Sequence, residues 1–80
     1  MKIFYHPNFR KALSKFPVPI KNKFEKQATY LVENIRHPSL HAKKYEESTG
    51  IWQARVDKGV RFYFLIEDDT YILLDIREHD

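Results

Sequence analysis

The sequence predicts a two-layer α+β domain with the element order β-α-α-β-β-β, and two patterns predict it. In the last third of the chain, apolar residues recur at every second position over residues 51–56, 60–66 and 71–77, as in antiparallel strands. Before them, apolar residues recur at helical spacing over residues 7–16 and 19–36. With 80 residues and no cysteine, the chain forms a single domain whose core is sufficient but not generous.

The N-terminal part begins with a short apolar run at residues 3–5, which can add a strand to the sheet. Pro7 and Asn8 start the first helix, with Asn8 or its neighbour as the N-cap, and Pro17 ends it. The buried stripe of this helix consists of Phe9, Ala12, Leu13 and Phe16.

The second helix has Pro19 in its first turn and stops at His37-Pro38, because a residue that precedes proline disfavours the α region. Its apolar face consists of Ile20, Phe24, Ala28, Leu31 and Ile35, with Val32 beside them. Residues 39–50 are polar, and we expect them to be irregular.

The spacing of apolar residues in the three C-terminal strands predicts one apolar and one polar sheet face, because successive side chains of a strand point to opposite faces. We expect both helices to cover the apolar face and to leave the polar face open. The apolar face consists of Trp52, Ala54, Val56, Val60, Phe62, Phe64, Ile66, Ile72, Leu74 and Ile76. The polar face consists of Gln53, Arg55, Arg61, Tyr63, Asp75 and Arg77.

Two turns set the register between these strands. Residues 57–59 are predicted to form a three-residue hairpin loop in which Gly59 adopts a positive φ. A two-residue loop would set core residues opposite outward ones. The second turn is centred on residues 68–70, which places Tyr63 opposite Asp75.

This register lines up an arginine row across the open face, because Arg55 lies opposite Arg61 and Arg61 lies opposite Arg77. Like charges directly opposite one another on neighbouring strands destabilise a sheet. The row is tolerated more easily if an anion such as a phosphate binds there, which is the interpretation we favour. The alternative is that the three side chains are solvated and splay apart in water.

Charge and composition narrow the classes of function. A net charge of +3 permits a nucleic-acid or acidic-protein partner without demanding one. The absence of cysteine excludes a disulfide-stapled secreted scaffold and a thiolate metal site, and it fits a reducing cytosol. No segment approaches the length of a membrane span or has the form of a signal peptide, so we expect a cytoplasmic protein without a membrane partner.

The predicted fold and several local motifs resemble the RelE/ParE superfamily of type II toxin–antitoxin toxins, with its RelE-like branch favoured. The resemblance covers essentially the whole chain, and it rests on residues 9–13, 37–40, 50–56, 59–62 and 74–80. It implies that the protein has a cognate antitoxin as its partner.

The RelE-like branch implies an mRNA endonuclease that acts on the ribosome and inhibits translation. In this chemistry a ribose 2′-hydroxyl attacks the adjacent phosphate, without a metal and without a small-molecule cofactor. Arg55, Arg61 and Arg77 fall where such enzymes keep residues that bind phosphate and stabilise charge. His79 falls in the stretch where several relatives place a catalytic histidine.

Proton transfer must come from groups other than arginine, which hardly ever deprotonates. Histidine is the side chain best suited to proton transfer near neutral pH, so His79 is a candidate, although a terminal residue can also be frayed and solvated. Asp75 could act as a base, but we expect it to be a cross-strand partner of Tyr63 or of an arginine. The candidates for contact with RNA are Gln53, Lys43, Lys44, Lys58 and Tyr63.

Two alternatives use the same fold. One is a ParE-like toxin that inhibits DNA gyrase, for which the arginine row is dispensable. The other is an inactive module that only binds its antitoxin. Gln53 stands where the best-known nuclease has a lysine, and the chain stops at Asp80, where many relatives continue to a functional tyrosine. Both departures favour the inactive module slightly.

Overall fold

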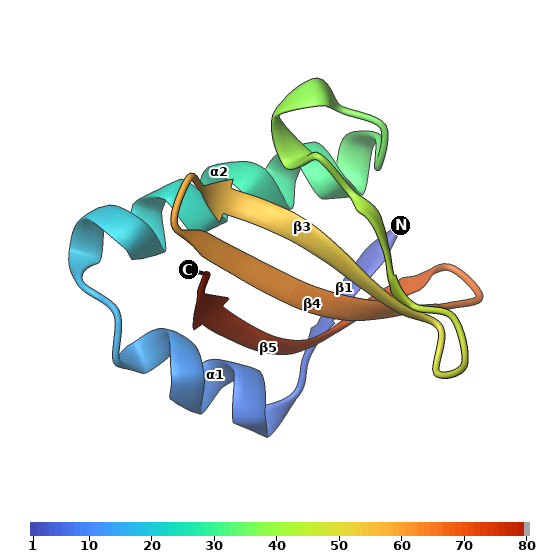
Figure 1. Cartoon of the computed structure of the whole chain (residues 1–80), viewed down its shortest axis with the longest axis horizontal. Helices are drawn as coiled ribbons and strands as arrows, with labels where there is room; N and C mark the ends of the chain where they lie inside the picture. The colour runs from blue at the N-terminus through green and yellow to red at the C-terminus, as the bar shows by residue number, and fades with distance from the viewer. Residues whose placement is uncertain (80) are drawn as a thin grey trace.

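A five-stranded sheet with two helices on one face makes up the computed structural model, which describes residues 1–79 (Figure 1). Asp80 lies outside the described residues. The elements are β1 (Lys2–Tyr5), α1 (Pro7–Ser14), α2 (Val18–Glu33), η1 (Pro38–Leu40), β2 (Lys43–Glu46), β3 (Ile51–Asp57), β4 (Val60–Glu67) and β5 (Thr70–Glu78). The predicted α+β architecture is confirmed, with one strand more than the sequence indicated.

The strands lie in the order β1-β5-β4-β3-β2. The N-terminal run that was expected to add a strand does so, because β1 pairs in parallel with the first half of β5. The other neighbours are antiparallel. No helix within residues 1–79 is long and apolar enough to span a membrane.

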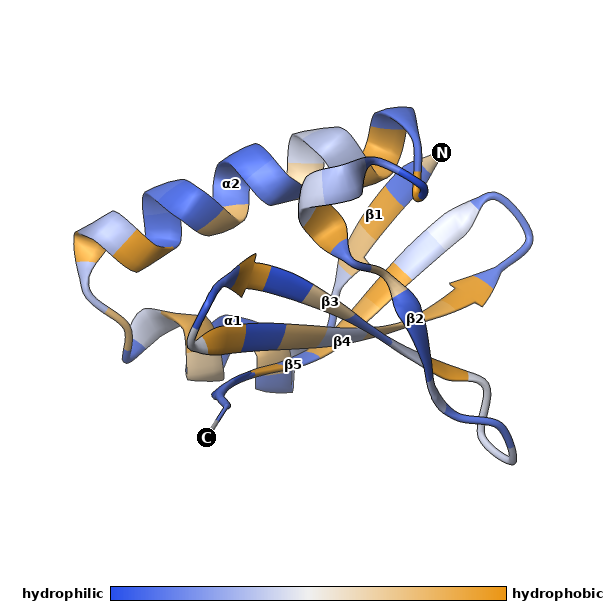
Figure 2. Ribbon diagram, turned by 45° about the horizontal axis from the view of Figure 1, so that its top comes forward, coloured by the Kyte–Doolittle hydropathy of each residue, from blue (hydrophilic) through white to orange (hydrophobic). Residues whose placement is uncertain are grey.

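The core lies between the helices and one sheet face, as predicted. Hydrophobic and hydrophilic residues alternate along β3 and β4 (Figure 2). Phe9 of α1 and Phe24 of α2 are fully buried, and the ring of Phe24 meets that of Phe62 edge-on at 5.5 Å between centroids. Burying such large rings is the main favourable contribution that a small core can offer.

The prediction that residues 39–50 are irregular is wrong. Residues 38–40 form the 3₁₀ turn η1, and residues 43–46 form the edge strand β2. Lys43 lies opposite Gln53 and Lys44 opposite Trp52, with a bulge at the next residue. All four residues of β2 are exposed. An edge strand that is solvated on both faces shows no apolar alternation, so the sequence carried no signal for it.

The ends of both helices also differ from the expectation. The side chain that caps α1 is His6 rather than Asn8, because Nδ1 of His6 accepts a hydrogen bond from the Asn8 backbone N–H at 3.1 Å. Helix α2 stops at Glu33, before His37-Pro38 is reached. The next residue, Asn34, is extended and its Oδ1 accepts from the Arg36 N–H at 2.9 Å, a local bond that competes with the helix.

The two hairpin turns are tighter than predicted. The β3–β4 turn has two residues, Lys58 and Gly59, because Asp57 already pairs with Val60. Gly59 does not use a positive φ, and its N–H donates instead to Oδ1 of Asp57 at 2.9 Å. The β4–β5 turn also has two residues, Asp68 and Asp69, since β5 begins at Thr70. Here it is Asp68 that adopts a positive φ, of 53°.

A bulge in each of the two hairpins restores the predicted register of the arginine row, one beside the β3–β4 turn and one in the middle of the β4–β5 pairing. The bulged residues are Val56 of β3 and Leu74 of β5, which have no paired residue on β4. Arg55 therefore lies opposite Arg61, Arg61 opposite Arg77, and Tyr63 opposite Asp75, as expected. A bulge inserts one extra residue into one strand of a pair, so it cancels the shift of a shorter turn.

Beyond the second bulge the predicted faces of β5 are exchanged. Tyr71 and Leu73 are buried in the core, whereas Ile72 and Leu74, which were assigned to the apolar face, are not. Ile66, also assigned to the core, is exposed at the far end of β4. Side chains of a strand alternate between the two faces, so one inserted residue moves all the side chains between the bulge and the turn to the opposite face.

Candidate functional site

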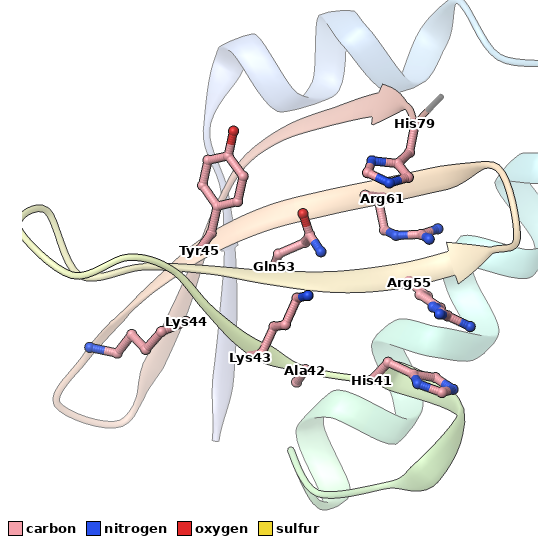
Figure 3. A pocket seen from close by; sticks show the side chains of 9 residues that line it. All are labelled: His41, Ala42, Lys43, Lys44, Tyr45, Gln53, Arg55, Arg61 and His79. Carbon is pink, nitrogen blue, oxygen red and sulfur yellow. The ribbon is translucent and has the colours of Figure 1, made fainter.

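A groove of about 690 Å³ lies on the open face of the sheet, between β2, β3 and the C-terminal end of β5 (Figure 3). The helices cover the opposite face. The groove is lined by His41, Ala42, Lys43, Lys44, Tyr45, Gln53, Arg55, Arg61 and His79.

The lining of the groove is cationic, because four of its nine residues are lysine or arginine and none is acidic. Lys43 projects toward Gln53 from β2, while Arg55 and Arg61 occupy the end near the β3–β4 turn (Figure 3). Such a concave surface attracts anions and raises their local concentration.

Arg61 is the most constrained of the cations, with 7% of its surface exposed. Its Nη1 donates hydrogen bonds to the carbonyl oxygens of Asp57 at 2.8 Å and Lys58 at 3.0 Å, and more weakly to that of Val60 at 3.4 Å. Within residues 1–79, every hydrogen bond of this guanidinium comes from Nη1. The protein therefore holds the side chain by one nitrogen and leaves its Nε and Nη2 for another ligand.

Arg55 is held through its backbone rather than its side chain. Nε2 of Gln27 on α2 donates to the carbonyl oxygen of Arg55 at 2.8 Å and to that of Ser39 at 3.1 Å. Oε1 of Gln27 accepts from Oγ of Ser39 at 3.0 Å. The buried amide of Gln27 thus joins η1 to β3 at Arg55, where β3 is no longer paired with β2. The contact holds in place the segment that leads from η1 to Lys43 and forms one wall of the groove.

The third member of the arginine row is not part of the groove lining. Nε of Arg77 lies 3.0 Å from Oδ2 of Asp75, and its guanidinium carbon lies 4.4 Å from the centre of the Tyr63 ring. Asp75 is thus the partner of an arginine, as expected, but of one on its own strand. Two arginines of the row face the groove, and the third is already engaged by a carboxylate and an aromatic ring.

His79 is ordered at its backbone, whose N–H donates to the Gly59 carbonyl oxygen at 2.7 Å. This bond continues the pairing of β5 with the start of β4 and argues against a frayed end. The exposed imidazole stands next to Arg61 on the β5 side of the groove, and His41 stands near Arg55 on the other side (Figure 3).

Solved structures of toxins share this fold. A YoeB/ParE toxin from Agrobacterium tumefaciens matches with a TM-score of 0.82 at 12% identity, covering 100% of both chains. A chain of the archaeal RelE–RelB complex from Pyrococcus horikoshii matches with a TM-score of 0.79 at 18% identity, covering 96% of this chain and 92% of that one. A chain of the heterotetrameric YoeB–YefM toxin–antitoxin complex from Staphylococcus aureus gives 0.80 at 13%, covering 100% and 98%.

The chain has the RelE/ParE toxin fold. No protein-family model and no curated protein matches its sequence. Likeness at these identities establishes the fold, so the activity has to be argued from the groove that this RelE/ParE fold carries.

The other predicted RNA contacts are spread unevenly over the RelE/ParE fold. Gln53 and Lys43 lie side by side in the groove. Lys44 reaches its rim, although its ammonium lies 5.6 Å from the centre of the Trp52 ring on the other face of β3. Lys58 lies in the β3–β4 turn, outside the lining.

Tyr63, predicted as a stacking surface, lies on the open face but is covered. It is 6% exposed, because Tyr45 packs against it with 4.9 Å between ring centroids and Arg77 lies over it. Tyr63 therefore offers little ring surface to a base. Tyr45, which is 51% exposed, is the accessible aromatic side chain of the groove.

Sequence reasoning missed Tyr45, His41 and Gln27. The first two belong to the segment that was taken as irregular, so nothing indicated which face they would occupy. Gln27 did leave a signal, because it interrupts the apolar stripe of the second helix between Phe24 and Leu31. A polar residue inside a buried stripe needs hydrogen-bond partners, and Gln27 finds them in Ser39 and Arg55.

Two tyrosines outside the groove have perturbed acidity. Burial raises the pKa of Tyr71. Burial also raises the pKa of Tyr5, with a further increase from the carboxylate of Glu25 and an opposing effect of Arg10. Both phenols belong to or border the core and have no part in the groove.

Proposed function

We propose that this protein is the toxin of a type II toxin–antitoxin system and that it cleaves mRNA on the ribosome without a metal. The single observation that carries the proposal is the groove in which Arg55 and Arg61 lie between two imidazoles with no acidic residue in the lining. The shared fold with YoeB, ParE and RelE toxins supports the assignment.

The two arginines suit the phosphate of the scissile bond. Guanidinium groups stay charged and offer planar pairs of donors to phosphate oxygens. The free donors of Arg61 are preorganised, because its Nη1 is already held by the turn. Preorganised donors that face the charge developing in the transition state are usually the largest single contribution to catalysis.

The two histidines suit the proton transfers. As the 2′-oxygen forms its bond to phosphorus, the 2′-hydroxyl loses a proton, and the departing 5′-oxygen gains one as its bond to phosphorus breaks. His41 and His79 are the two histidines of the lining, and imidazole is the side-chain group best suited to exchange protons near neutral pH. We assign the acid to His79, beside Arg61, and the base to His41, on the opposite side of the groove.

Arg77 takes a supporting part in this proposal. Its guanidinium is paired with Asp75 and lies over Tyr63, so it contributes to the long-range potential and to the support of the aromatic pair rather than to the scissile phosphate. The partners that follow from the proposal are mRNA, the ribosome and a cognate antitoxin, and the place of action is the cytoplasm.

The proposal is tested by adding purified protein to a cell-free translation reaction and mapping the new 5′ ends of the mRNA. Arg55→Ala is the informative variant, because the side chain of Arg61 also holds the β3–β4 turn, and Arg61→Ala would disturb the structure as well as the site. Arg36→Ala, an exposed arginine outside the groove, is its matched control. We expect cuts with the wild type and with Arg36→Ala, and cuts reduced at least about a hundredfold with Arg55→Ala.

A ribosome-free reaction completes the test. Cuts that require ribosomes support the proposal, whereas cuts in free RNA indicate a ribonuclease that needs no ribosome. Absence of cuts in every reaction contradicts the nuclease function. In that case a gyrase supercoiling assay distinguishes the gyrase inhibitor from an inactive antitoxin-binding module.

A further inference from the structure

We propose that the exposed ring of Tyr45 is a stacking site for one base of a single-stranded nucleic acid that runs through the groove. The site rests on the proposed function only in that a phosphate of the same strand lies at Arg55 and Arg61. It adds a subsite for a nucleobase to the phosphate site that the cations of the groove form.

Tyr45 has the exposure and the position that such a site requires. It is the bulged residue of β2, and half of its surface is accessible. Its ring stands up from the sheet at one end of the groove, with Gln53 between it and Arg61 (Figure 3). A base that entered the groove from this end would meet the ring before the arginines.

The faces of the Tyr45 ring are not occupied by a parallel ring. Within residues 1–79 Tyr45 meets one aromatic ring, that of Tyr63, and the two planes make an angle of 65°. A flat π-surface next to a cationic groove is the arrangement by which proteins bind single strands with little sequence preference.

Tyr45 is also supported from behind. Tyr63, against which it packs, is buried and is itself covered by the guanidinium of Arg77, 4.4 Å from the ring centre. A ring that is held in place before the ligand arrives loses less conformational entropy on binding. This support gives a structural role to the contact between Arg77 and Tyr63.

The spacing fits a short stretch of a single strand. Gln53 and Tyr63 form one cross-strand pair, and Arg55 and Arg61 form the next pair on the same face. Two residues along a strand cover about 6.8 Å, and nucleotides in a stacked strand rise about 3.4 Å each. The base on Tyr45 would thus belong to a nucleotide within one or two of the phosphate at the arginines.

The lining favours a nucleic acid over a peptide as the occupant. None of the nine side chains is acidic, and the polar group nearest to Tyr45 along β3 is the amide of Gln53, which both donates and accepts. Phosphates spaced along one chain satisfy several cations at once, while the intervening bases need a surface to stack on. An acidic peptide could satisfy the cations but would leave the aromatic surface unused.

The test is an NMR titration of the whole ¹⁵N-labelled chain with a 2′-deoxy tetranucleotide, which has no 2′-hydroxyl and cannot be cleaved. The titration is repeated with four tetranucleotides that each lack one base. The backbone amides of Arg55 and Arg61 report phosphate binding, and the ring protons of Tyr45 report stacking. We expect upfield shifts of the Tyr45 ring protons with the intact probe, and about five- to tenfold weaker binding when one particular base is missing.

Variants separate stacking from general affinity. Tyr45→Ala should weaken binding of the intact probe by the same factor, and removing the sensitive base from the probe should then cost nothing more. Tyr45→Phe should keep the affinity. Phe4→Ala, which removes an exposed ring from the opposite edge strand, is the matched control and should bind like the wild type. The amide spectra of all variants show directly whether they are folded.

Three outcomes overturn the base site. In the first, all the base-deleted probes bind as tightly as the intact one while the Arg55 and Arg61 amides still shift, so the phosphate site alone stands. In the second, Tyr45→Ala binds like the wild type. In the third, oligoglutamate shifts the Tyr45 ring and the tetranucleotide does not, which makes the groove a peptide site. Ribosome-dependent cleavage by the wild type is measured separately, so it survives or fails independently.

Discussion

Nη1 of Arg61 lies 2.8 Å from the carbonyl oxygen of Asp57, so one nitrogen of a proposed phosphate ligand also closes the turn between β3 and β4. Arg61 thus has a structural and a functional part, and they are carried by different atoms of one guanidinium. This explains how a nearly buried arginine is tolerated directly opposite another one.

The structural part predicts that Arg61→Ala loses stability. The carbonyl oxygens of Asp57 and Lys58 would lose a charged donor, and hydrogen bonds to charged groups contribute about 1.5–3 kcal/mol. We expect the free energy of unfolding, measured in urea, to fall by about 2 kcal/mol, against less than about 0.5 kcal/mol for Arg55→Ala. Equal stabilities of the two variants would contradict this assignment.

Gln27 is predicted to hold the wall of the groove. Gln27→Leu keeps the side-chain size but removes all three hydrogen bonds that join α2, η1 and β3. We expect a loss of about 1–3 kcal/mol of stability and faster hydrogen exchange at Ser39 and at residues 41–43. Lys26→Leu, on the exposed side of the same helix, is the control. Unchanged exchange at Ser39 in Gln27→Leu would refute the role.

The two histidines predict a pH-dependent cleavage rate. A base must be neutral and an acid must be protonated, so the rate should pass through a maximum between the two ionisations. His79→Gln and His41→Gln should each lower the rate about 10²- to 10⁴-fold and remove one limb of the profile. His6→Asn, which keeps a capping acceptor on α1, should leave the profile intact. A profile that keeps both limbs in His41→Gln would exclude His41 as the base.

The burial of Tyr71 predicts that the free energy of unfolding falls at alkaline pH. Burial raises the pKa of the Tyr71 phenol in the folded state. The unfolded chain therefore releases this proton more readily, and the contribution of the neutral phenol is lost as the pH rises above the ordinary tyrosine value of about 10. Urea unfolding at pH 8 and pH 11 should show a smaller loss for Tyr71→Phe than for the wild type. Identical losses in the two proteins would disprove the coupling.

Local patterns were enough to predict the layers and the arginine row. The alternation through Phe62 and Phe64 identified the core face, and the requirement that one face be buried gave the pairing of Arg55 with Arg61. That pairing was predicted with the wrong turn. A three-residue loop and a two-residue turn with a bulge give the same register, and the choice between them depends on local geometry that periodicity does not report.

The parts that the sequence did not predict depend on contacts between distant residues. The groove exists because an edge strand without apolar alternation pairs with β3, which brings Tyr45 over Tyr63. The same contact takes Tyr63 away from solvent, although its parity was predicted correctly. Arg77 likewise has the expected register, but its pairing with Asp75 and Tyr63 removes it from the groove.

The bulge at Leu74 has a consequence for the open face as a whole. It turns Ile72 outward, where it lies opposite Leu65 on one side and Phe4 on the other. The face therefore has two chemically different ends, a cationic one at the C-terminus of β5 and a hydrocarbon one at its start. A segment laid along its full length would gain from ion pairing at one end and from dehydration at the other, so added salt would weaken its binding only in part.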